Sequence, residues 1–195
     1  MPKITKAPPA PTLPTAIKSR ENAKLEEGLE VATFASGCFW GTEHLFSKYY
    51  SHLPQFKAVV GYTGGKEDVT DPSYRQVCTG ATDHAEAVQL TYQKGSVGYG
   101  ELVEFFYRTH DASTLNSQGP DKGTQYRSAI FYHSPEQEAV ARAVTAEVQD
   151  KYYQGRPIKT EITPSGVWWN AEDYHQHYLD VNPDGYECPT HRFYW

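Results

Sequence analysis

The sequence is poor in the features that mark several large classes of protein. It has 3 cysteines in 195 residues, too few for the disulfide framework of a small secreted protein and consistent with a reducing compartment. No apolar run approaches the roughly 20 residues that a membrane span needs. The net charge is −6, and without a basic stripe a nucleic-acid-binding surface is disfavoured. We therefore expect a cytoplasmic protein that binds neither membranes nor nucleic acids.

The first 24 residues differ in composition from the rest of the chain. Prolines recur there without a periodic apolar face, at Pro2, Pro8, Pro9, Pro11 and Pro14. This composition predicts a disordered leader over 1–24. Basic residues, with no acid before Glu21, leave an organelle-targeting signal open, although the prolines argue against the amphipathic helix that such a signal forms. Residues 25–195 are expected to form a single domain, of which 182–195 is an irregular tail.

From residue 25 onward the hydrophobic pattern predicts alternating strands and helices. Strands are expected over 30–36, 56–62, 85–92, 127–132 and 159–163, and helices over 39–50, 99–110, 135–152 and 171–179. The order strand–helix–strand–strand–helix–strand is that of a ferredoxin-like split βαβ core. We therefore predict an α+β protein, a two-layer α/β sandwich with C-terminal extensions.

The most informative stretch is the junction between the first predicted strand and the first predicted helix. Gly37 and Cys38 end the strand, and Phe39, Trp40 and Gly41 open the helix. A thiol placed there lies near unpartnered N–H groups, whose partial positive charge favours the thiolate. A lone cysteine is more often a buried apolar residue, but this position indicates a nucleophile. The two aromatic residues at the turn indicate an apolar wall beside it.

Three other polar residues are candidates for the same site. Glu86 lies between alanines in a predicted strand, where an ionised carboxylate is costly. It is either solvated on an outward strand face or a carboxyl group with a raised pKa that donates a proton. Tyr74 lies in a long polar loop, and Tyr126 lies in a loop that runs into a strand, where site residues are often displayed. Tyr126 could equally be an ordinary aromatic residue at a strand start.

Five motifs occur in a fixed order between about residues 31 and 178. They are Gly37-Cys38-Phe39-Trp40-Gly41, Gly61-Tyr62-Thr63-Gly64-Gly65, Pro72-Ser73-Tyr74-Arg75, His84-Ala85-Glu86-Ala87-Val88 and Gly123-Thr124-Gln125-Tyr126-Arg127-Ser128. Together they resemble the methionine sulfoxide reductase A family. The resemblance implies an α/β sandwich of the split βαβ kind. It also implies a thiol-dependent oxidoreductase that reduces methionine-S-sulfoxide, free or peptide-bound, in the repair of oxidised proteins.

The resemblance implies a role for each matching residue in the reaction. Cys38 attacks the sulfoxide sulfur and is left as a sulfenic acid. Glu86 is the acid that protonates the sulfoxide oxygen, and the phenols of Tyr74 and Tyr126 donate hydrogen bonds to it. These four residues are therefore expected to surround one substrate.

The resemblance also implies how the substrate is held. Phe39 and Trp40 match the family's apolar pocket for the methyl group, and Asp121 matches a position that holds the substrate backbone. No metal or other cofactor is implied, because thioredoxin or dithiothreitol serves as the reductant. We expect a monomer whose partners are thioredoxin and either oxidised proteins or free methionine sulfoxide.

A sulfenic acid needs a second thiol, and two are available in this chain. Cys78 lies in the long loop and Cys188 in the irregular tail. A disulfide needs Cα atoms within about 7 Å, so the residues alone leave both open. The resemblance favours Cys188, since family members commonly keep a resolving cysteine in the tail. No thiol follows Cys188, in contrast to relatives with two tail cysteines, which implies one Cys38–Cys188 disulfide reduced directly by thioredoxin.

Other kinds of site were weighed against this hypothesis. A cysteine hydrolase would pair Cys38 with a base such as His84 or His110. A thiol redox sensor would form the same disulfide without turning over a sulfoxide. Cys188 and His191 have the spacing of half a zinc site, but His175 and His177, two apart on a predicted helix, point to different sides.

Overall fold

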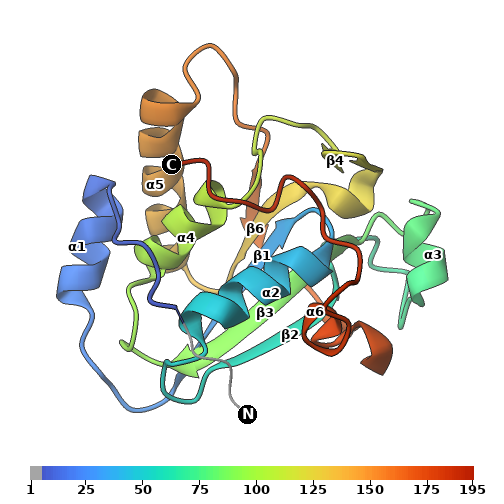
Figure 1. Cartoon of the computed structure of the whole chain (residues 1–195), viewed down its shortest axis with the longest axis horizontal. Coiled ribbons are helices and arrows are strands. Elements are labelled where there is room, and N and C mark those ends of the chain that lie inside the picture. Colours follow the sequence, from blue (N-terminus) through green and yellow to red (C-terminus); the bar gives the residue numbers. More distant parts are fainter. Residues whose placement is uncertain (1–5) are drawn as a thin grey trace.

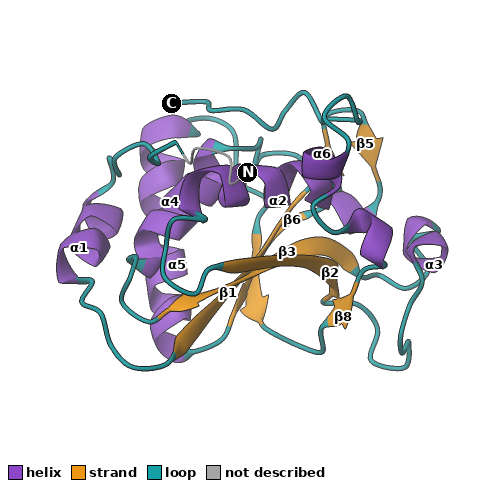
Figure 2. Cartoon of the chain, turned by 60° about the horizontal axis from the view of Figure 1, so that its bottom comes forward, coloured by secondary structure: helices purple, strands orange, loops and turns teal. Residues whose placement is uncertain are grey.

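A mixed β-sheet runs through the centre of the protein, whose computed structural model describes residues 6–195 (Figures 1 and 2). Its strand order is β7–β6–β1–β3–β2–β8. The bounds are β1 (Leu29–Ser36), β2 (Lys57–Thr63), β3 (Ala85–Gln93), β6 (Ser128–Tyr132), β7 (Glu161–Pro164) and β8 (Trp169–Asn170). β7 runs parallel to β6, and the other neighbours are antiparallel. β3 therefore lies between β1 and β2, as a split βαβ core requires, and the predicted α/β sandwich is confirmed.

Three helices connect the principal strands. They are α2 (Phe39–Tyr50) between β1 and β2, α4 (Tyr99–Arg108) between β3 and β6, and α5 (Pro135–Tyr152) between β6 and β7. Figure 2 shows α2 and α4 on the same side of the sheet. The expected bounds of α2 and α5 are met. The start of α5 follows from local signals, because the Ser134 side chain accepts a hydrogen bond from the N–H of Gln137 and Pro135 occupies the first helical position.

Stacked phenylalanines join β1 to the two helices above it. Phe34 of β1 stacks on Phe46 of α2 at 5.3 Å between ring centroids and on Phe106 of α4 at the same 5.3 Å. All three rings are at most 1% exposed. Burial of each such side chain contributes on the order of 1.5–3 kcal/mol. The end of β1, where Cys38 follows, is thereby held firmly against the helical layer.

β8 brings a distant segment to the edge strand of the core. Gly61 of β2 pairs with Asn170 of β8, and a Cβ at Gly61 would overlap the carbonyl oxygen of Trp169. Only glycine permits this close approach of two backbones. As a result, the residues that follow β8 lie beside the end of β2 and close to the start of α2.

The leader prediction is wrong for residues 6–24, because helix α1 (Pro14–Asn22) forms there and packs along α4. Glu147 of α5 accepts hydrogen bonds from the N–H and hydroxyl of Thr15, the latter at 2.6 Å. Glu101 of α4 forms an ion pair with Arg20 at 2.6 Å. These partners are remote in sequence, so local composition could not reveal them. Residues 1–5 of the predicted leader lie outside the described residues.

The helix predicted over 171–179 is also wrong. A 3₁₀ turn, η2 (Asp173–His175), and a short helix, α6 (Tyr178–Val181), replace it. His177 separates them with a φ of 52°, a left-handed conformation that interrupts a helix. Its N–H donates a 2.8 Å hydrogen bond to the buried Glu43 of α2, so a tertiary contact overrides the local helical pattern.

Small elements populate the loops that were expected to be irregular. They are α3 (Tyr74–Cys78), β4 (Ser117–Gln118), β5 (Asp121–Lys122) and the 3₁₀ turn η1 (Thr124–Tyr126). Ser73 and Gln76 form a capping box at the start of α3. This Ser-x-x-Gln spacing is a readable helix-start signal, and it could have located α3 from the sequence.

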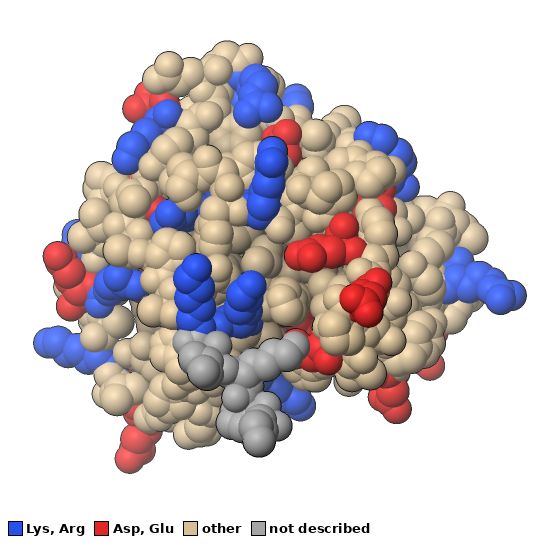
Figure 3. Space-filling model, in the orientation of Figure 1, with Lys and Arg blue, Asp and Glu red and all other residues tan. Residues whose placement is uncertain are grey.

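Acidic side chains gather on the face shown in Figure 3, over α6 and the tail that follows it. The exposed acidic residues of these two segments are Asp180, Asp184 and Glu187.

Within residues 6–195, no helix has both the length and the apolar character needed to cross a lipid bilayer.

Candidate active site

Cys38 lies at the junction of β1 and α2, as the sequence predicts. Gly37 turns the chain there with a φ of 96°, a conformation that favours glycine. A Cβ at Gly37 would also lie 2.6 Å from the Cβ of Gln118. Cys38 then occupies the N-cap position of α2. The glycine is required on two grounds, its backbone conformation and the close approach of β4.

Burial controls the ionisation of the Cys38 thiol in this structure. The residue is 8% exposed, and burial, followed by the negative charge of Glu86, raises the pKa of the thiol. The N–H of Trp40 in the first turn of α2 lowers that pKa, in the direction expected for a helix N-terminus. Burial outweighs it, so the expectation of a preformed thiolate does not hold for this state of the site.

Glu86 faces the buried start of α2 rather than solvent. It lies on β3, is 1% exposed, and its Oε2 accepts a 3.1 Å hydrogen bond from the N–H of Phe39. Burial raises the pKa of Glu86 to about 8, so the carboxyl group carries a proton at neutral pH. Its Oε1 is buried and has no hydrogen-bond partner among the described residues. The alternative of a solvated strand face is therefore wrong.

Two tyrosines approach Glu86 from different loop elements. Tyr74 begins α3 and Tyr126 ends η1. Burial first, and the charge of Glu86 second, raise the pKa of each phenol. Cys38 is also among the groups that raise the pKa of Tyr126. Both phenols are therefore neutral donors close to the carboxyl group, and Tyr126 is close to the thiol.

An acidic residue outside the predicted set positions Tyr74. Glu172 accepts a 2.8 Å hydrogen bond from the N–H of Tyr74 and another of 2.8 Å from the hydroxyl group of Tyr62. The carboxylate thus ties α3 to β2 across the site. The sequence offers only a weak signal for it, since Glu172 lies in the first turn of the helix predicted over 171–179, where acidic residues are favoured in any case.

Phe39 and Trp40 form an aromatic wall whose orientation depends on His175. The indole N–H of Trp40 donates to Nδ1 of His175 at 3.0 Å, and its ring stacks on Tyr178 at 3.6 Å. The ring of Phe39 lies 5.1 Å from that of His175. Burial lowers the pKa of His175, in agreement with a neutral ring that accepts at Nδ1. The sequence analysis considers this histidine only as a possible zinc ligand and does not predict its contact with Trp40.

The tail places Cys188 and Asp121 on the same side of the molecule. Tyr186 donates its hydroxyl to both carboxylate oxygens of Asp121, at 3.0 and 3.1 Å. Cys188 is 1% exposed, and its Sγ lies 3.1 Å from the hydroxyl of Thr190. The Cys188 thiol is directed at the carbonyl oxygen of Gln118 at 3.6 Å, and Gln118 lies against Gly37, the residue before Cys38. All three cysteines are free thiols.

Cys78 lies at the other end of α3 and is exposed. It shares a hydrogen bond with the phenol of Tyr74, which lowers the pKa of Cys78, while burial raises it more strongly. The cysteine is therefore near the site but is not enclosed by it.

The histidines considered for a hydrolase are occupied elsewhere. His110 bonds the carbonyl of Phe106 and the hydroxyl of Ser128, both at 2.7 Å, and burial lowers its pKa to about 4. His84 bonds the carbonyl of Thr82 at 3.1 Å. Neither ring has a hydrogen bond to Cys38, so the pairing that a hydrolase requires is not formed.

No group of three or more His, Cys, Asp or Glu residues in the described chain is arranged to hold a metal ion.

Comparison with known proteins agrees with this arrangement. A family model described as peptide methionine sulfoxide reductase matches residues 30–192. A probable peptide methionine sulfoxide reductase from Schizosaccharomyces pombe is 47% identical over 168 residues, covering 86% of this chain and 98% of that protein. The reduced form of Mxr1 from Saccharomyces cerevisiae superposes with a TM-score of 0.81 at 44% identity, covering 89% of this chain and 97% of that one. Mxr1 in complex with Trx2 superposes with a TM-score of 0.58 at 28% identity, covering 89% and 96%.

Proposed function

The chain belongs to the peptide methionine sulfoxide reductase family, and we propose that it reduces methionine-S-sulfoxide, free or peptide-bound, with Cys38 as the nucleophile. The observation that carries this assignment is that the Cys38 thiol and the Glu86 carboxyl group lie together at the start of α2. A buried thiol lies beside a protonated Glu86 whose Oε1 is free to meet a ligand. A hydrolase would need a base at that place, whereas a sulfoxide needs an acid.

In the first step the oxygen passes from the sulfoxide to Cys38. Glu86 donates its proton to the sulfoxide oxygen, which makes the sulfur electrophilic. The thiol transfers its own proton to the carboxylate as its sulfur attacks, so no thiolate needs to exist beforehand. Methionine leaves, Cys38 becomes a sulfenic acid, and Glu86 ends the step protonated.

The surrounding side chains orient the substrate for this transfer. Tyr74 and Tyr126 are neutral phenols that donate hydrogen bonds to the oxygen as it gains negative charge. Phe39 and Trp40 enclose the methyl group, because apolar aromatic faces exclude water from it. Asp121, whose carboxylate is reached by Tyr186, binds the substrate backbone. The contacts to the oxygen, to the methyl group and to the backbone of the substrate together select one configuration at the sulfur atom.

In the second step Cys188 resolves the sulfenic acid. Its thiol attacks Cys38, a Cys38–Cys188 disulfide forms, and water leaves with the sulfenic oxygen. Thioredoxin then reduces the disulfide, a partnership supported by the structure of the relative Mxr1 in complex with Trx2. The reaction uses no metal or other cofactor, and the enzyme acts as a monomer in the cytoplasm. Every residue to which these two steps assign a role lies within residues 25–195.

The test is reduction of the two epimers of methionine sulfoxide measured separately with dithiothreitol as reductant. Methionine should form from the S epimer at least tenfold faster than from the R epimer, because only one configuration places methyl group, oxygen and backbone together. The measurement is methionine released per enzyme, by chromatography. Equal rates on the two epimers, or no methionine from the S epimer, would contradict the proposed function.

Substitution of Tyr126 by phenylalanine should slow the first step about thirtyfold. One lost donor to a developing oxyanion costs on the order of 2–4 kcal/mol, and Tyr74 remains to provide the other. The readout is the rate of methionine formation in a single turnover. Tyr132→Phe is the matched control, since Tyr132 lies at the far end of β6 from Ser128, the residue paired with Ser36 beside the site. A normal rate in Tyr126→Phe would remove this phenol from the reaction.

A further inference from the structure

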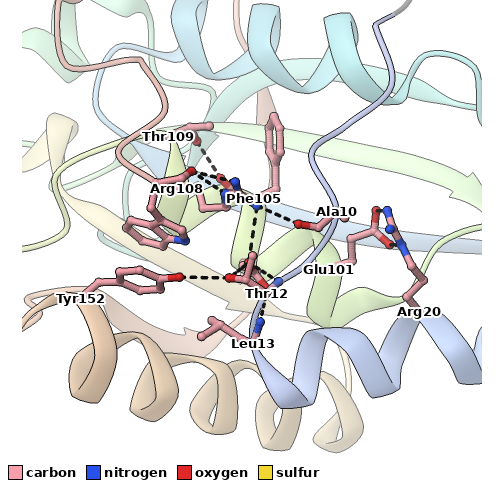
Figure 4. Close-up of polar contacts among 11 residues, drawn as sticks. Ala10, Thr12, Leu13, Arg20, Glu101, Phe105, Arg108, Thr109 and Tyr152 are labelled. Carbon is pink, nitrogen blue, oxygen red and sulfur yellow. Dashed lines mark hydrogen bonds and ion pairs between the residues drawn. The ribbon is translucent and has the colours of Figure 1, made fainter.

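Arg108, the last residue of α4, binds the backbone of both ends of the described chain. Its Nε and Nη2 donate to the backbone oxygen of Trp195 at 3.0 and 2.7 Å, and its Nη1 donates to the carbonyl oxygen of Ala10 at 3.0 Å. Figure 4 shows Arg108 and its contact with Ala10. The residue is 8% exposed. Neither of these acceptors belongs to the active site described above.

Glu104, one helical turn earlier on α4, completes the arrangement. It is 1% exposed and accepts hydrogen bonds from the N–H groups of Thr12 and Leu13 and from the hydroxyl of Thr12, at 2.8 to 3.0 Å. The distance from Oε1 of Glu104 to Nη1 of Arg108 is longer, 3.6 Å. The N-terminal arm, residues 10–13, therefore supplies the donors that this buried carboxylate needs, and the guanidinium group of Arg108 stays directed at the backbone oxygens of Trp195 and Ala10.

A second contact joins the arm to the tail. The hydroxyl of Tyr152 lies 3.1 Å from that of Thr12, and the ring of Tyr152 stacks on Trp195 at 3.9 Å between centroids. The N–H of Tyr194 also donates to the carbonyl of Arg108 at 3.0 Å. The end of the tail is thus fixed by backbone hydrogen bonds and by a stacked ring at once.

This anchor lies shortly after Cys188 in the chain. Between residues 181 and 190, Cys188 alone is buried. His191 follows and donates from Nε2 to the carbonyl of Ser36 at 2.8 Å, two residues before Cys38. Cys188 directs its thiol at the carbonyl oxygen of Gln118, and its position therefore depends on how firmly the residues that follow it, 191–195, are held.

We propose that Arg108 and Glu104 are positioning residues for the resolution step, in which they hold the tail so that Cys188 meets the Cys38 sulfenic acid. The inference rests on the proposed function, in which the Cys188 thiol attacks that sulfur, a disulfide forms and water leaves. Neither residue contacts the methionine sulfoxide. The first step is therefore independent of the pair, and the second step depends on it.

The N-terminal arm participates because a buried carboxylate cannot be left without donors. If the N-terminal arm moves away, Arg108 becomes the available donor to Glu104. The guanidinium group of Arg108 then turns from Trp195 toward Glu104. For this reason the tail, residues 191–195, and the arm, residues 10–13, are either both bound to α4 or both released from it. The arm is then a structural part of the resolving apparatus, although it is far from Cys38 in the sequence.

The experiment compares the two steps in Arg108→Lys. Lysine keeps the charge beside Glu104 but lacks the planar group that donates to the backbone oxygens of both Trp195 and Ala10. The protein is mixed with one equivalent of methionine-S-sulfoxide and no reductant. Methionine, the Cys38–Cys188 disulfide and the dimedone adduct of a Cys38 sulfenic acid are then followed in time. Arg142→Lys is the matched control, an arginine of α5 that is 58% exposed in its side chain and pairs with Glu138.

In Arg108→Lys the methionine burst should keep its rate within twofold, while disulfide formation slows about tenfold and the dimedone adduct accumulates. Arg142→Lys should behave as the unmodified protein. The inference is wrong if Arg108→Lys forms the disulfide at the normal rate, or if both steps slow in parallel, as general destabilisation would cause. If that variant does not fold, Trp195→Ala decides, because it removes the stacked ring and should also slow only the disulfide.

Failure of the proposed function has a different signature. In that case the unmodified protein itself would release no methionine, or its disulfide would join Cys38 to Cys78. The two hypotheses are therefore separated in the same set of measurements.

Discussion

Substitution of Glu86 by glutamine is expected to slow methionine formation about a thousandfold below pH 8. A positioned general acid contributes roughly 10²–10⁴ in rate, and the amide can donate a hydrogen bond but cannot release a proton. Glu86 is buried against the N–H of Phe39 with one free carboxyl oxygen, and the phenols of Tyr74 and Tyr126, whose pKa values are raised, are much weaker acids. Substrate binding should change far less than the rate. The measurement is the single-turnover burst of methionine by rapid quench.

The pH dependence of the burst provides a second test of the same role. Since the pKa of Glu86 is raised to about 8, the unmodified enzyme should lose the first step as the pH rises through that value. The Glu86→Gln variant should lack this decline. The difference in burst rate between the unmodified enzyme and the variant should therefore become smaller above pH 8. A burst of normal rate in the variant at pH 8 would exclude Glu86 as the acid.

Stability provides the control for this variant. The folded carboxyl holds its proton up to about pH 8, whereas an unfolded glutamate releases it near 4.3. The folded state therefore loses stability relative to the unfolded state as the pH rises between these values. Glutamine has no such loss, so the variant should melt at or above the temperature of the unmodified protein at pH 8. A large fall in melting temperature would make its lost activity uninformative.

Substitution of Cys188 by serine should leave the first equivalent of methionine intact and reduce thioredoxin-supported turnover at least a hundredfold. Thioredoxin exchanges with a disulfide, and without Cys188 no Cys38 disulfide forms. The Cys38 sulfenic acid then persists and should be trapped by dimedone in stoichiometric amount. The measurements are methionine per enzyme with and without thioredoxin, and the mass of the Cys38 peptide.

Cys78→Ser is the matched control for the tail cysteine. Cys78 is exposed and lies beside Tyr74 rather than in the tail, so its loss should leave both the burst and the turnover with thioredoxin within twofold. If Cys188→Ser still forms an intramolecular disulfide, peptide mapping should find Cys78 in it. That result would transfer the resolving role to Cys78.

The sequence predicted the core of the fold because its signals are local. The apolar strand at Leu29–Ser36, the turn at Gly37 and the capped helix at Pro135–Tyr152 each follow from residues close together in the chain. The motif residues Cys38 and Glu86 could be placed on a strand end and a strand for the same reason. Their common site, however, came from the family resemblance and not from the spacing.

The features that the sequence missed are held by contacts between distant residues. Helix α1 depends on carboxylates of α4 and α5, and the break at His177 depends on Glu43 of α2. The role of His175 depends on the indole of Trp40. No periodicity or propensity records such pairs. The ionisation of Cys38 was mispredicted likewise, because helix position is visible in the sequence and burial is not.

The segment between α6 and His191 is a loop with two fixed ends, not a free tail. The entropy of closing such a loop rises only slowly with its length, by about 0.6 kcal/mol for each doubling. Insertions and deletions there should therefore cost the folded protein little, as long as Trp195 keeps its place beside Arg108. The length of this loop is therefore limited less by the stability of the fold than by the need for Cys188 to reach Cys38.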